Sequence, residues 1–117
     1  MNYLWDRMTD FVQVLVLRAR HGEEDAVVAL HEDWQRRLRG RTNGYLYGEL
    51  FTRPNDPSTF ISVARYESEE ACRAAADDPE QAAWYSRLVS LLDSKPCNVD
   101  LRSAWRCFED AAASPAP

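Results

Sequence analysis

The sequence predicts an α+β fold of the ferredoxin-like kind, with the element order βαββαβ and a four-stranded antiparallel sheet. Three stretches carry this prediction: an alternating apolar run over residues 11–20, a helical repeat over residues 23–39, and a strand followed by two helices over residues 59–92. With right-handed crossovers, the first and third strands are expected in the centre of the sheet and both helical segments on one of its faces.

The first predicted strand, residues 11–20, is apolar on both of its faces. One face holds Phe11, Leu15 and Leu17, with the polar Gln13 among them, and the other holds Val12, Val14 and Val16. A strand that is apolar on both sides is predicted to be central and covered on both sides.

The first helix is predicted after Gly22, where three acidic residues favour a helix N-terminus. Its apolar residues recur at steps of three and four, which predicts a single stripe facing the sheet: Val27, Leu30, Trp34 and Leu38. Several arginines and then Gly40 mark its C-terminal end. This arginine cluster is interpreted as a solvated helix end.

The second and third strands are predicted over residues 45–53 and 60–66, joined by a turn rich in proline, asparagine and aspartate. Ser68 is expected to cap the next helix, which Asp77-Asp78 interrupts. Asp78 then caps a last helix, with Gln81 completing a capping box. A fourth strand is predicted over residues 97–107, with Val99, Leu101 and Trp105 on one face.

Length and composition indicate one globular domain of 117 residues. We expect an N-terminal extension over residues 1–10, the domain over residues 11–108, and a disordered tail over residues 109–117. The net charge of −5 disfavours nucleic acid or an anionic membrane as partner. No membrane span or signal peptide is recognisable, and the three cysteines have no CxxC spacing, so a cytoplasmic location is expected.

A homodimer is predicted from the two apolar faces of the sheet. Two helices can cover only one face of the sheet, and a monomer rarely exposes an apolar patch larger than a few hundred Å². The simplest partner is a second copy, packed sheet against sheet with two-fold symmetry.

The stretches 12–22, 44–45, 60–69 and 78–79 resemble the antibiotic biosynthesis monooxygenase family of dimeric α+β barrels. The resemblance covers residues 11–105 and implies a pocket between the sheet and the helices of each subunit. It also implies an oxygenase of aromatic, polyketide-like molecules that needs no metal or flavin cofactor. The alternative is a non-catalytic dimeric barrel that binds a small apolar molecule.

Haem degradation, another activity in that superfamily, is disfavoured. Haem-degrading members use a histidine after the third strand as iron ligand and an asparagine on the first strand, where this chain has Ala75 and Leu15. Tyr66 stands where many members have tryptophan. The loss of that histidine also removes an obvious general base.

The resemblance implies a catalytic set formed by Arg65, Tyr66 and Tyr47, with Arg65 stabilising an enolate and the aromatic residues orienting the ring. A salt-bridged arginine at the strand end is the commoner role for Arg65. Trp84 is assigned to the core and, through the resemblance, to contact with a flat substrate.

Gln13 and Glu49 are the other candidate substrate-binding residues. The amide of Gln13 needs partners inside an apolar strand, and either the backbone or a ligand can supply them. Glu49 is interpreted first as an edge-strand charge or a dimer ion pair, with Arg65 or Arg102 as partner if its face is covered, and second as a base of raised pKa.

The two histidines and three cysteines of the chain are assigned no catalytic or metal-binding role. His21 and His31 are placed at the surface, and they form no metal site with the surrounding residues. Cys72 is predicted to be a small buried apolar residue, and Cys97 and Cys107 have no histidine nearby that would activate them.

Overall fold

The computed structural model describes residues 10–105 and confirms the predicted order of elements. The elements are β1 (Phe11–Arg18), α2 (Glu24–Arg37), the short 3₁₀ helix η1 (Arg39–Arg41), β2 (Tyr45–Arg53), β3 (Asp56–Tyr66), α3 (Glu69–Ala76), α4 (Pro79–Ser90) and β4 (Cys97–Arg102). Most of the predicted extension, the whole predicted tail and Cys107 lie outside the described residues.

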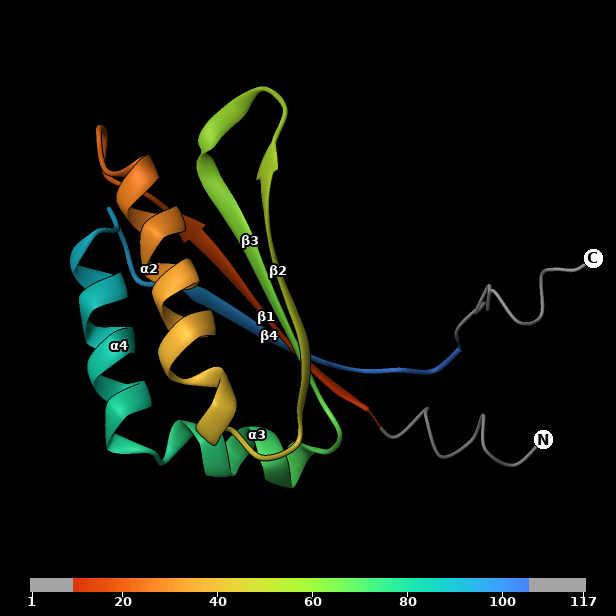
Figure 1. Cartoon of the computed structure of the whole chain (residues 1–117). Helices are drawn as coiled ribbons and strands as arrows, with labels where there is room; N and C mark the ends of the chain where they lie inside the picture. The colour runs from red at the N-terminus through yellow and green to blue at the C-terminus, as the bar shows by residue number, and fades with distance from the viewer. Residues whose placement is uncertain (1–9, 106–117) are drawn as a thin grey trace, which may run out of the picture.

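The four strands form one antiparallel sheet in the order β2-β3-β1-β4, so β1 and β3 are central as predicted. Figure 1 shows α2 and α4 side by side on one face of this sheet, with α3 at one end of it. In the described part of the chain, no helix covers the opposite face, which we call the open face. No helix in this part is long and apolar enough to cross a membrane.

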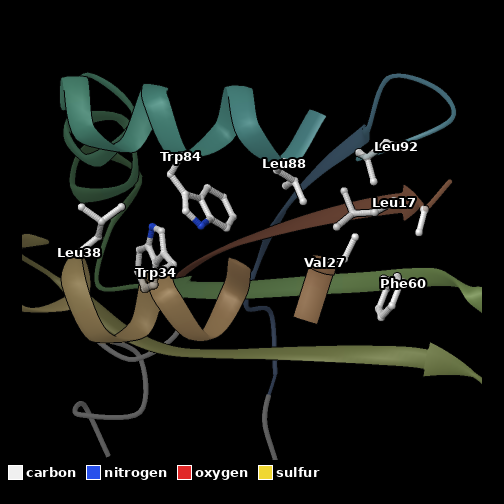
Figure 2. Packing of buried hydrophobic residues seen from close by; sticks show 9 residues of the cluster. Leu17, Val27, Trp34, Leu38, Phe60, Trp84, Leu88 and Leu92 are labelled. Atoms are coloured by element: carbon white, nitrogen blue, oxygen red, sulfur yellow. The ribbon is translucent and has the colours of Figure 1, made fainter. Parts of the chain in front are cut away.

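The main core lies between the covered face and the helices. Leu17 of β1, Val27 of α2 and Leu88 of α4 are each 0% exposed. Figure 2 shows how side chains from β1, β3, α2 and α4 converge there; the cluster consists of Leu17, Ala19, Val27, Trp34, Leu38, Phe60, Trp84, Leu88 and Leu92. Burial of such side chains contributes about 1.5–3 kcal/mol each, so this layer holds the helices on the sheet.

A second, smaller cluster forms under α3. Phe11, Tyr66, Cys72 and Ala75 pack together there. Cys72 is 7% exposed, which confirms its predicted burial. Because Phe11 and Leu17 lie on the same face of β1, the two clusters share that face and are separated along the strand by Gln13 and Leu15.

The helix caps are confirmed with one correction. The Ser68 hydroxyl accepts a hydrogen bond from the Ala71 amide at 3.1 Å, and the Asp78 carboxylate accepts one from the Glu80 amide at 2.9 Å. The predicted capping box is wrong, because the side-chain oxygen of Gln81 accepts a hydrogen bond from Trp34 Nε1 at 2.6 Å instead.

The prediction for the end of the fourth strand is also wrong. Strand β4 ends at Arg102, and Trp105, predicted to share a strand face with Val99 and Leu101, lies beyond it and is 75% exposed. Within residues 10–105, pairing with β1 ends at Arg102, opposite Phe11, so no neighbouring strand holds Trp105 against a buried face.

The open face carries the valine side of β1. Val14 lies opposite Val63 of β3 and Val99 of β4, and Tyr47 and Phe51 belong to the same face of β2. Four large side chains of this face are 41–48% exposed in the single chain: Tyr47, Phe51, Val99 and Leu101.

Candidate functional site

A cavity of about 790 Å³ lies between the covered face of the sheet and the helices. It occupies the gap between the two buried clusters, and Gln13 and Leu15 of β1 border it. Small-molecule sites in proteins have volumes of about 300–1,000 Å³, so this space suits a compact organic ligand.

Small residues on β2 and β3 leave room for this space: Gly48 of the edge strand β2, and Ser62 and Ala64 of the central strand β3. Gly48 pairs with Ala64, and Ser62 pairs with Leu50, all on the side that faces the cavity. A Cβ atom at position 48 would overlap the hydroxyl of Tyr45, so a glycine allows the tyrosine to lie over the strand.

Aromatic side chains of α2 and α4 line the side of the cavity that the helices form. Trp84 of α4 is 5% exposed, and its Nε1 donates a hydrogen bond to the Leu30 carbonyl at 2.7 Å. Its ring meets Trp34 at a centroid distance of 6.5 Å, and Figure 2 shows both indoles on the side where the helices face the sheet. Trp84 therefore is both a core residue and part of the cavity wall.

His31 of α2 lines this cavity, which corrects its predicted place at the surface. Its Nδ1 lies 2.9 Å from the Val27 carbonyl and its Nε2 lies 3.2 Å from Ser62 Oγ. Because a carbonyl can only accept, Nδ1 carries the proton in the neutral ring and Nε2 accepts from the Ser62 hydroxyl. The His31 ring also contacts Trp84 edge to face, at 5.2 Å between centroids.

Burial lowers the pKa of His31 below 6.5, its ordinary value. The imidazole is therefore neutral at pH 7. The lone pair of Nε2 can take a proton from a ligand once the Ser62 hydroxyl turns away from it.

This burial predicts a loss of stability in mild acid. The unfolded chain binds a proton at His31 near pH 6.5, whereas the folded chain binds it only at lower pH. Stability from this residue is thus fully present above pH 6.5 and is lost as the pH falls through the lower folded pKa. Calorimetry between about pH 7.5 and 5, above the range where most carboxylates titrate, should show Tm falling with pH.

The matched comparison uses the two histidines. A His31→Gln variant should show a flatter dependence of Tm on pH, and a variant of the exposed His21, His21→Gln, should keep the original dependence. Equal slopes for the unmodified chain and His31→Gln would contradict the assignment.

Three other titratable side chains of the cavity, Tyr45, Tyr66 and Cys72, are held in their neutral forms. Burial raises the pKa of the Tyr66 phenol, and also that of the Tyr45 phenol. Burial raises the pKa of the Cys72 thiol to about 11. These groups therefore act at pH 7 as neutral donors or acceptors, not as ionised nucleophiles.

Four of the predicted site residues line the cavity. Gln13 on β1, Tyr66 at the end of β3 and Trp84 on α4 do so on the covered face, and Glu49 borders it at the edge strand β2. The structure therefore brings the predicted amide, phenol and indole together around one volume.

Tyr47, Arg65 and Glu49 are arranged differently. Arg65 pairs in register with Val12 and Tyr47 on the open face, and its guanidinium contacts the Asp10 carboxylate at 3.2 Å. Glu49 borders the cavity at the edge strand, yet its carboxylate accepts a hydrogen bond from the Tyr47 hydroxyl. Within the described single chain, Arg65 contacts Asp10 and Arg102 contacts Glu69 at 3.1 Å, and an ion pair of Glu49 across a dimer stays a prediction.

No metal site is formed by the described residues. Across residues 10–105, no group of three or more histidine, cysteine, aspartate or glutamate side chains lies close enough to hold an ion.

The model of one protein family, antibiotic biosynthesis monooxygenase, matches residues 10–87 of this sequence. The chain belongs to this family. The matched region runs from the start of β1 into α4 and therefore includes nearly every element that lines the cavity. No match was found among curated proteins.

Solved structures support the fold of this family over most of the chain. One is SnoaB, a cofactor-independent oxygenase from Streptomyces nogalater, with a TM-score of 0.77, 13% identity, and coverage of 86% of this chain and 99% of that one. A protein of unknown function from Nitrosomonas europaea is 20% identical, with a TM-score of 0.72 and coverage of 89% and 98%. A conserved protein from Methanosarcina mazei Go1 has a TM-score of 0.76, 10% identity, and coverage of 85% and 97%.

The sequence analysis did not identify His31 as a residue that lines the cavity. Its position contained a usable signal, since it lies four residues after Val27 and three before Trp34, both on the buried stripe. A histidine at that spacing faces the sheet. The serine that completes its contacts is on β3, and sequence spacing alone does not reveal that partner.

Proposed function

We propose that this protein is a cofactor-independent oxygenase that acts on an aromatic, polyketide-like molecule in the cavity. The observation that carries the proposal is the half-open cavity, which combines aromatic walls with a few neutral polar groups. Membership in the antibiotic biosynthesis monooxygenase family supports this reaction class.

The reaction needs the substrate and dioxygen. A carbon acid such as an anthrone loses a proton from its CH₂ group, and the carbanion transfers an electron to dioxygen. Recombination forms a C–O bond, and the resulting peroxide loses water to leave a carbonyl. One CH₂ group and one O₂ molecule thus give one C=O group and one H₂O molecule. A dry cavity assists because donors interact more strongly with a developing enolate there.

The roles of the predicted residues follow from their positions. Trp84 holds the flat rings against the cavity wall, and Gln13 and Tyr66 donate hydrogen bonds to the enolate oxygen. We assign Arg65 and Tyr47 to the open face, where they shape the subunit contact. Glu49 accepts a hydrogen bond from the Tyr47 hydroxyl, and we assign it a structural role on the edge strand β2.

Oxygen uptake with a dithranol-like anthrone tests this proposal. Ala82 and Ala83 are neighbouring exposed residues of α4, but Ala82 lines the cavity and Ala83 does not. An Ala82→Trp variant should fill the mouth of the cavity and lower uptake at least about tenfold, because it excludes the substrate from its near-attack position.

The control is Ala83→Trp, which should retain the uptake of the unmodified chain. Circular dichroism of both variants checks that the fold is preserved. Uptake that does not exceed that of buffer, or equal uptake in the two variants, would contradict an oxygenase site in this cavity.

A binding protein without catalysis is the second candidate. Ala75 on α3, at the position where the family resemblance implies a histidine, favours it, since α3 offers no base to the cavity. Thermal stabilisation by aromatic ligands without chemical change would support binding over catalysis.

We also propose that the protein forms a homodimer through the open face. Its exposed side chains Tyr47, Phe51, Val99 and Leu101 support this, because together with the valines of β1 they form an apolar surface. Two-fold symmetry would place the same surface of each copy against the other.

A further inference from the structure

The helix α2 and the strand β3 bring His31 and Ser62 together inside the cavity. The contact of 3.2 Å between His31 Nε2 and Ser62 Oγ joins residues that are 31 positions apart in sequence. The Val27 carbonyl, 2.9 Å from Nδ1, fixes the opposite edge of the ring. Both His31 and Ser62 border the cavity, so a ligand there lies beside this pair.

We propose that His31 is the general base of this cavity, and that Ser62 is a positioning residue that holds Nε2 toward the ligand. This inference rests on the proposed function and adds the group that accepts the substrate proton. The Ser62 hydroxyl hydrogen turns away from Nε2, the C–H or O–H bond of the ligand breaks, its electron pair stays on the ligand, and the proton forms a bond to the Nε2 lone pair so released. The product of this step is an imidazolium beside a substrate anion.

Among the titratable side chains that line the cavity, His31 is the one best placed to accept a proton from a ligand. The titratable groups that line the same cavity from α2, β2, β3, α3 and α4 are Glu32, Tyr45, Glu49, Tyr66, Cys72 and Tyr85. Burial keeps Tyr45, Tyr66 and Cys72 protonated. Strands β1 and β4 contribute amides, Gln13 and Asn98, which do not titrate.

The two carboxylates among these groups are placed at the margin. Glu32 is an exposed residue of α2, and Glu49 is engaged by the Tyr47 hydroxyl on the edge strand. His31, by contrast, is held between α2, Ser62 and the ring of Trp84. Its lone pair is therefore fixed in direction before a ligand arrives, which is what efficient proton transfer needs.

Ionisation of bound 4-nitrophenol tests the base without any oxygen chemistry. In a pH titration with saturating protein, the visible absorbance of bound 4-nitrophenolate should appear at lower pH for the unmodified chain than for His31→Gln, because an imidazolium formed at His31 pairs with the phenolate. His21→Gln should titrate like the unmodified chain. Equal titration curves for the unmodified chain and His31→Gln overturn the inference.

Oxygen uptake with an anthrone separates this inference from the proposed function. The His31→Gln variant should lower kcat by about 100-fold or more and remove the acid limb of the pH profile. Full activity in this variant overturns the base while leaving the oxygenase intact. No uptake by the unmodified chain counts against the oxygenase, and the nitrophenol result then decides the base by itself.

The role of Ser62 is tested by the pH profile. The Ser62 hydroxyl donates to the neutral ring and favours it, so Ser62→Ala should raise the pKa of His31 and shift the acid limb to higher pH. Ser62→Thr keeps a hydroxyl and should restore the profile. An unchanged profile in Ser62→Ala overturns the positioning role.

Discussion

A Val14→Asp variant is expected to have the solution mass of one subunit, 13.5 kDa, under conditions in which the unmodified chain has twice that mass. Val14 lies in the middle of the open face, opposite Val63 and Val99. In a single chain a carboxylate there stays in contact with water, whereas in a dimer two of them would be buried together. Burying an unpaired charge costs several kcal/mol, which is enough to prevent association at micromolar concentration. Analytical ultracentrifugation measures the mass.

The matched control for this variant is Ala83→Asp. Ala83 is exposed on α4, on the side of the sheet away from the open face, so the same added charge should leave the mass unchanged. A solution mass of 13.5 kDa for the unmodified chain would contradict the proposed interface, as would a Val14→Asp variant that is still a dimer.

A Trp84→Ala variant is expected to lose about 3–5 kcal/mol in the free energy of unfolding. Trp84 is 5% exposed, and it packs against His31 and Trp34 while donating to the Leu30 carbonyl. Its removal leaves a space between α2 and α4 that the neighbouring side chains fill only in part. Urea denaturation at fixed protein concentration measures the loss, because association would make the midpoint concentration-dependent.

The conservative change Trp84→Phe separates packing from hydrogen bonding. It keeps most of the ring and removes the Nε1–H donor, so a loss of about 1–2 kcal/mol is expected. If Trp84→Ala cost no more than Trp84→Phe, the indole would not be the packing element between these helices.

Most of the fold could be predicted from the local pattern of the sequence. The alternation of side chains between the two faces of β1 involves only residues that are close in the chain, and so does the spacing of Val27, Trp34 and Leu38 along α2. The caps at Ser68 and Asp78 depend on hydrogen bonds over two or three residues. The prediction failed for Gln81, whose partner Trp34 is 47 positions away.

The candidate site could be predicted only in part. Gln13, Tyr66 and Trp84 were recognisable as polar or aromatic residues at positions facing a predicted sheet or helix layer. Arg65 and Tyr47 were grouped with them through the family resemblance, but the register of β3 with β1 and β2 places them on the open face. Residue type does not encode on which side of a strand the helices will pack.

The sequence by itself determined the order of elements, the central position of β1 and the two apolar faces of this strand, because these follow from periods of two and 3.6 residues. The tertiary structure decided which of the two faces the helices cover, and with it the cavity beside Gln13 and Leu15. It also decided the environment of His31, since its burial and its contact with Ser62 exist only after α2 packs on β3. The physical reason is that hydrogen bonds and desolvation depend on distances between segments that only the packed chain brings together.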